Sequence, residues 1–298
     1  MALLLNNHTI PKISIVSPSY NQGAFLEQTM LSILNQGYPD LEYIVIDGGS
    51  SDDSLEIIKK YENRLAYWVS EQDNGQYHAI NKGFGHATGE IMAWLNSDDL
   101  YFPWTLQCVG EIFSRCPEVE WITTCYPMAL DERGLAVNCC NVDSFLKDSF
   151  FKGEFLPGFD WYAHGWIQQE STFWRRSLWE KSGAFLDDDL QLAGDFELWC
   201  RFFKQSYLYG VKLPLAGFRC HDTQKTATRI EKYKREALDS FVSHGGVPRG
   251  KNLSWLMQNV PNIYKLGATL FGLNRHRKYQ FVRNRRKHGW VVEESFLE

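Results

Sequence analysis

The tetrapeptide Asn96-Ser97-Asp98-Asp99 carries the clearest chemistry in the sequence. It follows an apolar run, residues 91–95, that has the length and composition of a buried strand. Two adjacent carboxylates at a strand end repel each other unless a proton or a cation lies between them. Mg²⁺ and Mn²⁺ prefer such oxygen ligands and commonly keep substrate phosphates as further ligands. The tetrapeptide therefore indicates a metal site, although Ser and Asp are also ordinary turn and cap residues.

Polar clusters also follow the other strands predicted in the first half of the chain. Apolar runs at residues 13–17, 41–46 and 65–69 lead into residues 17–21, Asp47 and a loop that contains Asp73. Helical patterns begin near residues 23, 51, 76 and 103. Strands that alternate with helices predict an α/β fold, with a mostly parallel, Rossmann-like sheet and helices on both faces. Because parallel strands end at one edge, we expect the polar clusters to converge there.

The second half of the chain is less regular. Residues 126–164 read as an aromatic, Gly-rich loop, and order returns at residues 168–174, with a helix starting at Gly194 and a strand near residues 209–213. We expect one domain at residues 1–228, with a nucleotide-binding half at about 11–125 and an acceptor half at about 126–228. Residues 229–298 are expected to form a helical, basic C-terminal extension, amphipathic at 255–273.

Charge is unevenly distributed along the 298 residues. Residues 1–239 carry 21 basic and 33 acidic side chains, whereas residues 240–292 contain ten Lys or Arg and no Asp or Glu. The acidic body argues against a nucleic-acid partner, and the basic tail suits contact with an anionic membrane surface. The seven cysteines have no CxxC spacing, and neither a signal peptide nor a spanning segment is recognisable. We therefore expect a cytoplasmic protein, peripheral on the membrane at most.

Five sequence blocks, in order, resemble family 2 glycosyltransferases, which have the GT-A fold and include many polysaccharide and O-antigen transferases. The blocks are Ile-Val-Ser-Pro-Ser-Tyr-Asn-Gln (15–22), Ile-Asp-Gly-Gly-Ser-Ser-Asp (46–52), Asp-Asn-Gly-Gln-Tyr-His-Ala-Ile-Asn-Lys-Gly (73–83), Leu-Asn-Ser-Asp-Asp (95–99) and Gly-Asp-Phe-Glu-Leu-Trp (194–199). Each block alone is weak evidence, but five in order form a strong signal. The resemblance covers residues 11–225 and leaves the tail out.

The resemblance implies inverting transfer of a sugar from a nucleotide-sugar donor, most often a UDP-sugar, with Mn²⁺ or Mg²⁺ as cofactor. The acceptor would be a hydroxyl of a glycan or of a lipid-linked molecule, as in polysaccharide biosynthesis. Asp99 would be the direct metal ligand, and Asp98 would contact the ribose or the metal. His221 matches a position near the diphosphate or metal. The motif here is Ser-Asp-Asp rather than the strict Asp-X-Asp.

The resemblance also assigns residues to the donor. Ser17, Pro18 and Tyr20 would lie against the nucleotide, Asp47 would accept a hydrogen bond from the ring N–H of the base, and Asp73 and Lys82 match further nucleotide-side positions. Taken alone, Asp47 reads equally well as a turn residue, Asp73 before Asn-Gly reads better as a turn residue, and Lys82 reads equally well as a solvated helix lysine.

Asp195 matches the catalytic base of the family. It also reads as a helix N-cap, and the helix dipole is expected to lower its pKa and keep it ionised. On the acceptor side we expect Gln169 and Glu170, together with rings that could stack on sugars, from Trp161, Trp166 and Trp174. Core packing is the alternative role for these tryptophans.

Two other functions fit parts of the pattern. A nucleotidyltransferase would also use acidic groups and a metal, but it normally has a Gly-rich, basic phosphate loop near the first strand, which residues 17–21 lack. A non-catalytic module that binds a nucleotide sugar would keep the donor residues without turnover.

Overall fold

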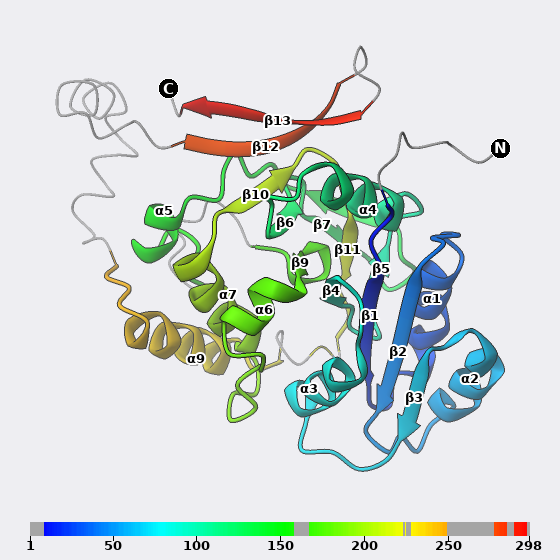
Figure 1. Cartoon of the computed structure of the whole chain (residues 1–298). Coiled ribbons are helices and arrows are strands. Elements are labelled where there is room, and N and C mark those ends of the chain that lie inside the picture. Colours follow the sequence, from blue (N-terminus) through cyan, green and yellow to red (C-terminus); the bar gives the residue numbers. More distant parts are fainter. Residues whose placement is uncertain are drawn as a thin grey trace.

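The computed structural model describes residues 9–157, 167–222, 224, 228–248, 277–284 and 289–296. In the last two ranges it describes the backbone and the side chains of Phe281 and Trp290. These residues form two sheets with helices packed around the larger one (Figure 1).

The larger sheet has nine strands in the order β13-β12-β10-β6-β9-β4-β1-β2-β3. Their bounds are β1 (Ile13–Ser19), β2 (Leu41–Asp47), β3 (Tyr67–Ser70), β4 (Ile91–Trp94), β6 (Trp121–Thr124), β9 (Phe173–Arg175), β10 (Leu208–Val211), β12 (Arg277–Asn284) and β13 (Gly289–Phe296). Strands β1 to β4 pair in parallel, as β6 does with β10 and β10 with β12. Only β9 and β13 run antiparallel to their neighbours. The mostly parallel sheet predicted from the sequence is confirmed.

The helices are α1 (Gly23–Leu34), α2 (Ser54–Tyr61), α3 (Gln76–His86), α4 (Thr105–Arg115), α5 (Lys147–Phe151), α6 (Arg176–Lys181), α7 (Gly194–Gln205) and α9 (Ile230–Ser243), with short 3-10 turns η1 (Glu62–Arg64) and η2 (Gln169–Ser171). Right-handed crossovers place α1 and α2 on one face of the sheet. After β3 the chain runs back across β2 and β1 to β4. A right-handed crossover in this reverse direction places α3 on the opposite face of the sheet (Figure 1).

A smaller four-stranded sheet has the order β5-β11-β7-β8. Its strands are β5 (Leu100–Tyr101), β7 (Met128–Leu130), β8 (Ala136–Cys139) and β11 (Ala216–Arg219). The prediction of an irregular loop at residues 126–164 is therefore wrong for β7, β8 and α5. These elements are three to five residues long, and every side chain of β8 is exposed, so the sequence shows no alternation that would reveal a strand.

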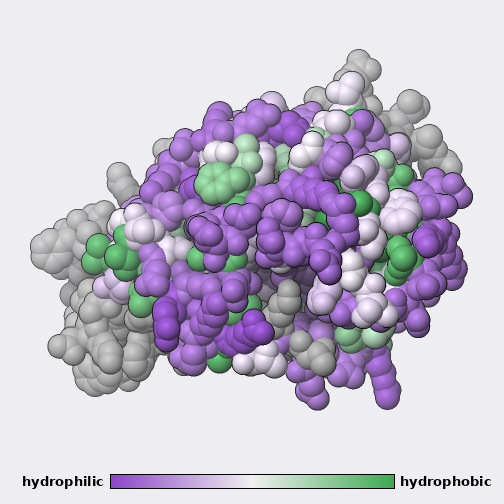
Figure 2. Space-filling view, turned by 90° about the horizontal axis from the view of Figure 1, so that it is seen from below, coloured by the Kyte–Doolittle hydropathy of each residue, from purple (hydrophilic) through white to green (hydrophobic). Residues whose placement is uncertain are grey.

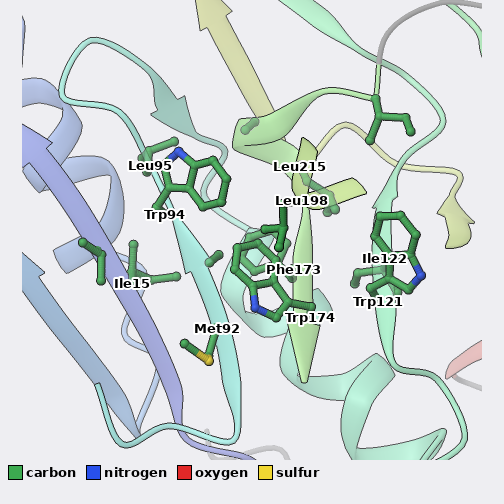
Figure 3. Packing of buried hydrophobic residues seen from close by; sticks show 14 of the residues in the cluster. Ile15, Met92, Trp94, Leu95, Trp121, Ile122, Phe173, Trp174, Leu198 and Leu215 are labelled. Carbon is green, nitrogen blue, oxygen red and sulfur yellow. The ribbon is translucent and has the colours of Figure 1, made fainter. Parts of the chain in front are cut away.

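Tryptophan side chains fill the centre of the core between β4, β6, β9 and α7. The ring of Trp174 packs edge-on against Trp94 at 5.6 Å between centroids (Figure 3). The ring of Trp199 lies 6.0 Å from that of Trp174 and 5.5 Å from that of Trp121. All four rings are at most 1% exposed. The prediction that Trp174 faces the acceptor is therefore wrong, because its ring is enclosed by other rings. Trp161 and Trp166 lie outside the described residues.

The C-terminal extension is helical only in part. Helix α9 packs against α7, as predicted for a helical tail. Residues 277–284 and 289–296 instead form an antiparallel hairpin, and β12 joins the main sheet by pairing in parallel with β10. The two strands contain aromatic and β-branched residues, Tyr279, Phe281 and Val282 in β12 and Trp290, Val291 and Val292 in β13, which favours strands over a helix. The amphipathic stretch 255–273 lies outside the described residues. Within the part of the chain that is described, no helix has the length and apolarity to cross a membrane.

Two glycines of α3 provide a test of the packing between this helix and the sheet. A Cβ atom on Gly83 would collide with Val16 of β1 and come within 3.2 Å of Ile46 of β2, whereas a Cβ on Gly85 would meet nothing within 4 Å. Alanine favours a helix over glycine by about 0.5–1 kcal/mol, and overpacking a core costs about 1–3 kcal/mol. We expect Gly85→Ala to raise the free energy of unfolding. The free energy of unfolding of Gly83→Ala should be about 1–3 kcal/mol lower than that of Gly85→Ala. Urea unfolding measures both, and equal stabilities would contradict this packing.

Candidate active site

The carboxyl ends of β1, β2 and β4 bring the predicted polar clusters to one edge of the sheet. In the parallel register Ser19 lies opposite Asp47, and Val16 lies opposite Trp94. The segments after β2 and β4 are tied to β1, because the amide of Gly48 donates to the carbonyl of Ser19 at 2.8 Å and the amide of Leu95 to that of Val16 at 2.9 Å. This edge is at the bottom of Figure 1, and the view from below in Figure 2 shows a mainly hydrophilic face.

Asp47 is completely buried and organises the turn that follows β2. Its carboxylate accepts hydrogen bonds from the amides of Gly49 (3.2 Å) and Ser50 (2.9 Å), and from the hydroxyls of Ser50 (2.5 Å) and Ser70 (2.6 Å). Asp73 lies beside the same turn, since a Cβ on Gly48 would be 2.8 Å from its carboxylate. The turn role of Asp47 is therefore present in the structure, and its contact with a base remains a prediction.

The other predicted nucleotide residues differ in their exposure. Ser17 is buried, and its hydroxyl accepts a hydrogen bond from the Tyr43 hydroxyl at 3.1 Å. Pro18 is also buried, whereas the ring of Tyr20 is 58% exposed and available to a ligand. Lys82 forms an ion pair with Glu71. A diphosphate would therefore have to compete with that carboxylate for the Lys82 ammonium group.

Three different elements hold Asp99. Its Oδ1 accepts the backbone amide of Arg219 on β11 at 2.9 Å, and its Oδ2 accepts the side-chain amide of Asn96 at 3.3 Å. Its backbone carbonyl accepts a hydrogen bond from the Thr29 hydroxyl of α1 at 2.8 Å. The Asn96 carbonyl oxygen in turn accepts the Gln76 amide at 2.7 Å. Asp99 is thus fixed in position and only 1% exposed.

Asp98 lies against His221. The Nε2 atom of His221 is 3.1 Å from Oδ2 of Asp98. The imidazole ring also packs on Phe25 of α1, with 4.6 Å between centroids. The Arg219 guanidinium lies over the same phenyl ring at 4.8 Å. Two groups from the end of β11 therefore flank Phe25 beside the acidic motif.

Like charges accumulate around this motif. Burial raises the pKa of Asp99 well above its usual range, and the neighbouring Asp98 and Glu170 carboxylates raise it further. Burial also raises the pKa of Glu170 to about 8, with Asp195 and Asp98 acting in the same direction. Oε1 of Glu170 is buried and has no hydrogen-bond partner among the described residues. Asp98, Asp99 and Glu170 are thus close enough to repel one another, and Asp195 repels Glu170; we call these four side chains the carboxylate cluster.

The carboxylate cluster fits a divalent cation, because a positive charge would relieve the repulsion and use the free Glu170 oxygen. Within the described residues, no three His, Cys, Asp or Glu side chains already form a ready metal cage.

Asp195 lies in the first turn of α7 and is not its N-cap, since the N-cap is Ala193. Burial raises the pKa of Asp195 to about 6, and hydrogen bonds from the amides of Phe196 and of Asp195 itself lower it only in part. The expected net lowering by the helix start is therefore wrong, because desolvation outweighs it. Oδ1 of Asp195 has no hydrogen-bond partner among the described residues.

Asp195 lines a small pocket. The rest of its lining is apolar or aromatic and comprises Phe150, Phe155, Pro157, Ile167, Phe196, Trp199 and Tyr233. The tail residue Tyr233 lies beyond the resemblance, and sequence reasoning did not find it. A carboxylate with one unpartnered oxygen in such surroundings can accept a proton from a bound hydroxyl.

The two predicted acceptor residues on η2 have different environments. The side-chain amide of Gln169 donates to the carbonyl of Trp94 at 2.8 Å, and its carbonyl oxygen accepts from Asn96 at 3.2 Å. Gln169 therefore connects β4 to the acidic motif inside the protein. Glu170 is 3% exposed and belongs to the carboxylate cluster.

Comparison with known proteins identifies the fold. Residues 14–118 match the family described as Glycosyl transferase family 2. The chain is 27% identical over 227 residues to an uncharacterized glycosyltransferase of Rickettsia prowazekii, which covers 75% of this chain and 70% of the relative. It is similar to the crystal structure of S. aureus TarS 1-349 in complex with UDP-GlcNAc, with a TM-score of 0.62, 16% identity, and coverage of 78% of this chain and 66% of that one.

A further similar structure is the mannosyltransferase PcManGT from Pyrobaculum calidifontis in complex with GDP-Man and Mn²⁺. Its TM-score is 0.57 at 19% identity, and the match covers 89% of this chain and 74% of that one. At these identities the solved structures establish the fold, which is GT-A.

The raised pKa of Glu170 predicts how stability depends on pH. An acid whose pKa is higher in the folded than in the unfolded state binds more protons when folded, so the free energy of unfolding falls as pH rises from about 4.5 towards about 8. Glu170→Gln removes this titration. Without added metal, we expect Glu170→Gln to be more stable than the original chain at pH 8, with a gap that shrinks strongly by pH 5. Urea unfolding measures the gap, with the exposed Glu62→Gln as control. An equal difference in unfolding free energy at both pH values would show that ionisation of Glu170 does not destabilise the folded state.

Proposed function

We propose that this chain, whose residues 14–118 match glycosyltransferase family 2, is a metal-dependent, inverting glycosyltransferase. In this proposal it moves a sugar from a nucleotide-sugar donor, most often a UDP-sugar, to a hydroxyl of a glycan or a lipid-linked acceptor. The observation that carries the proposal is the carboxylate cluster, which joins the acidic motif after β4 to Asp195 at the start of α7.

On the donor side, the nucleotide would lie over the ends of β1 and β2, with its diphosphate directed towards Asp98 and Asp99. Asp99, Asp98 and His221 would hold Mn²⁺ or Mg²⁺, which when bound offsets negative charge on the departing diphosphate. The hydrogen bonds to Asp99 from Asn96 and Arg219 keep this carboxylate in place before the donor arrives. A site held in advance needs little rearrangement in the transition state.

On the acceptor side, Asp195 would act as general base. The acceptor oxygen forms a bond to the anomeric carbon as the bond from that carbon to the diphosphate breaks, and the hydroxyl proton passes to Asp195. One displacement of this kind inverts the configuration at the anomeric carbon. A pKa near 6 suits a base at neutral pH, since most of the carboxylate is ionised while its proton affinity is higher than that of an ordinary aspartate.

Several features support the choice of ligands. The similar solved structures contain UDP-GlcNAc and GDP-Man, and one of them contains Mn²⁺. The apolar lining beside Asp195 suits the less polar faces of a sugar or lipid-linked acceptor. A contact between the basic residues of 240–292 and an anionic membrane surface belongs to the same proposal, because it would bring the enzyme to a lipid-linked acceptor.

Two substitutions separate this enzyme from a binding module that lacks turnover. Asp195→Asn keeps the shape of the side chain but removes the base, so we expect transfer to fall at least about 100-fold while donor affinity is retained. Asp99→Asn should abolish the metal dependence of donor binding. The measurements are release of the nucleoside diphosphate from a panel of nucleotide sugars with Mn²⁺, and calorimetric titration of the same donors. Near-normal turnover by folded Asp195→Asn would exclude Asp195 as the base.

The pKa of Asp195 predicts the acid limb of the pH profile. The base must be deprotonated, so kcat/KM is constant above the pKa of the free enzyme and falls about tenfold for each pH unit below it. We expect this limb to have its midpoint near pH 6, at saturating Mn²⁺. A midpoint near pH 4, typical of an exposed aspartate, would contradict the buried environment of Asp195.

A further inference from the structure

Helix α9 lies beyond the residues that match the family, yet one of its side chains is bonded to the segment that leads into the active site. Glu236 accepts hydrogen bonds from three consecutive backbone amides, those of Gln191 (3.2 Å), Leu192 (2.8 Å) and Ala193 (3.1 Å). Asp195 follows Ala193 by two residues. We propose that Glu236 is a positioning residue for Asp195. This inference rests on the proposed function, in which Asp195 is the base.

The beginning of α7 needs such a partner. Ala193 is the N-cap of the helix and has no side-chain oxygen to accept a hydrogen bond from a helix amide. A helix start leaves several amides without partners inside the helix. Here the Ala193 amide is bonded by a carboxylate that comes from another helix, 43 residues later in the chain. Charge-assisted bonds of this kind are shorter and stronger than neutral ones, so they fix the entry to α7.

Neighbouring contacts hold the same segment from two sides. On the α9 side, Lys232 donates to the side chain of Gln191 at 2.6 Å and lies 3.7 Å from Glu236. On the α3 side, the ring of Tyr77 is so close to Gly194 that a Cβ there would be 2.8 Å from it. Residues 191–194 are thus held between α9 and α3.

The same face of α9 reaches the pocket of Asp195. Tyr233, three residues before Glu236, is buried and lines that pocket. Residues three apart on a helix lie on one face, so Tyr233 and Glu236 approach α7 together. In-line attack requires the base within a few tenths of an ångström of its place, and a shift of about 1 Å can cost about 100-fold in rate. Loss of the Glu236 bonds would release such a shift at Asp195 without touching the donor residues.

The test compares three variants of the full chain. Glu236→Ala removes all three bonds, Glu236→Gln keeps an uncharged acceptor, and Glu231→Gln removes a charge from an exposed position of the same helix. The readouts are kcat and donor KM for Mn²⁺-dependent release of UDP from UDP-sugars, calorimetric donor affinity, and hydrogen exchange of the amides of residues 191–195.

We expect Glu236→Ala to lower kcat about 100-fold while donor KM and affinity stay within twofold, and to speed exchange at 191–195. Glu236→Gln should recover part of the loss, and Glu231→Gln should match the original chain. Unchanged kcat in Glu236→Ala, or parallel loss of kcat and donor affinity, would overturn the positioning role. If the original chain neither binds nor turns over a nucleotide sugar, the proposed function fails instead. Exchange at 191–195 then decides whether Glu236 holds the segment, and unchanged exchange overturns that part as well.

Discussion

Repulsion among four carboxylates at the carboxyl end of the sheet is the interaction on which the rest of this structure depends. Asp98, Asp99, Glu170 and Asp195 come from distant parts of the chain, and burial raises the pKa of three of them. Such an arrangement is unfavourable without a cation or a proton, so the surrounding fold must supply the free energy that maintains it. The enclosed tryptophan cluster between β4, β9 and α7 reaches this site through Trp199, which lines the same pocket as Asp195.

Hydrogen bonds hold the acidic motif from several directions. The Arg219 amide approaches Asp99 from β11, Gln169 joins Asn96 to the backbone of β4, and Thr29 reaches the motif from α1. Asp47, by contrast, has one oxygen, Oδ2, that accepts three hydrogen bonds from its turn and from Ser70, whereas Oδ1 accepts one. The cation side of the site is therefore prepared in advance, and recognition of a base by Asp47 would use the remaining lone pair of Oδ1.

The sequence predicted the parts of this structure that repeat over many residues. Long runs with clear periodicity, such as β1, α1 and β2, were located within one or two residues, and their parallel order placed Ser19, Asp47 and the acidic motif at one edge. Short elements were not predicted, because three or four exposed residues such as those of β8 show no hydrophobic periodicity. The environment of a single side chain was not predicted either. No local sequence feature distinguishes the enclosed Trp174 from a ring that faces a sugar. Nor does the local sequence show that desolvation dominates the pKa of Asp195. The roles of Tyr233 and Glu236 could not be predicted from the sequence, because the residues they contact lie about 40 positions earlier in the chain.

The pairing of β10 with β12 has a consequence for how the chain matures. Until residues 277–284 have emerged from the ribosome, β10 has only β6 beside it, and its other side presents unpaired amides and carbonyls. An open strand of this kind invites pairing with another nascent chain. The late hairpin therefore covers this side of β10 and makes β13 the edge strand in its place, and translation that halts after α9 would leave the edge of β10 exposed.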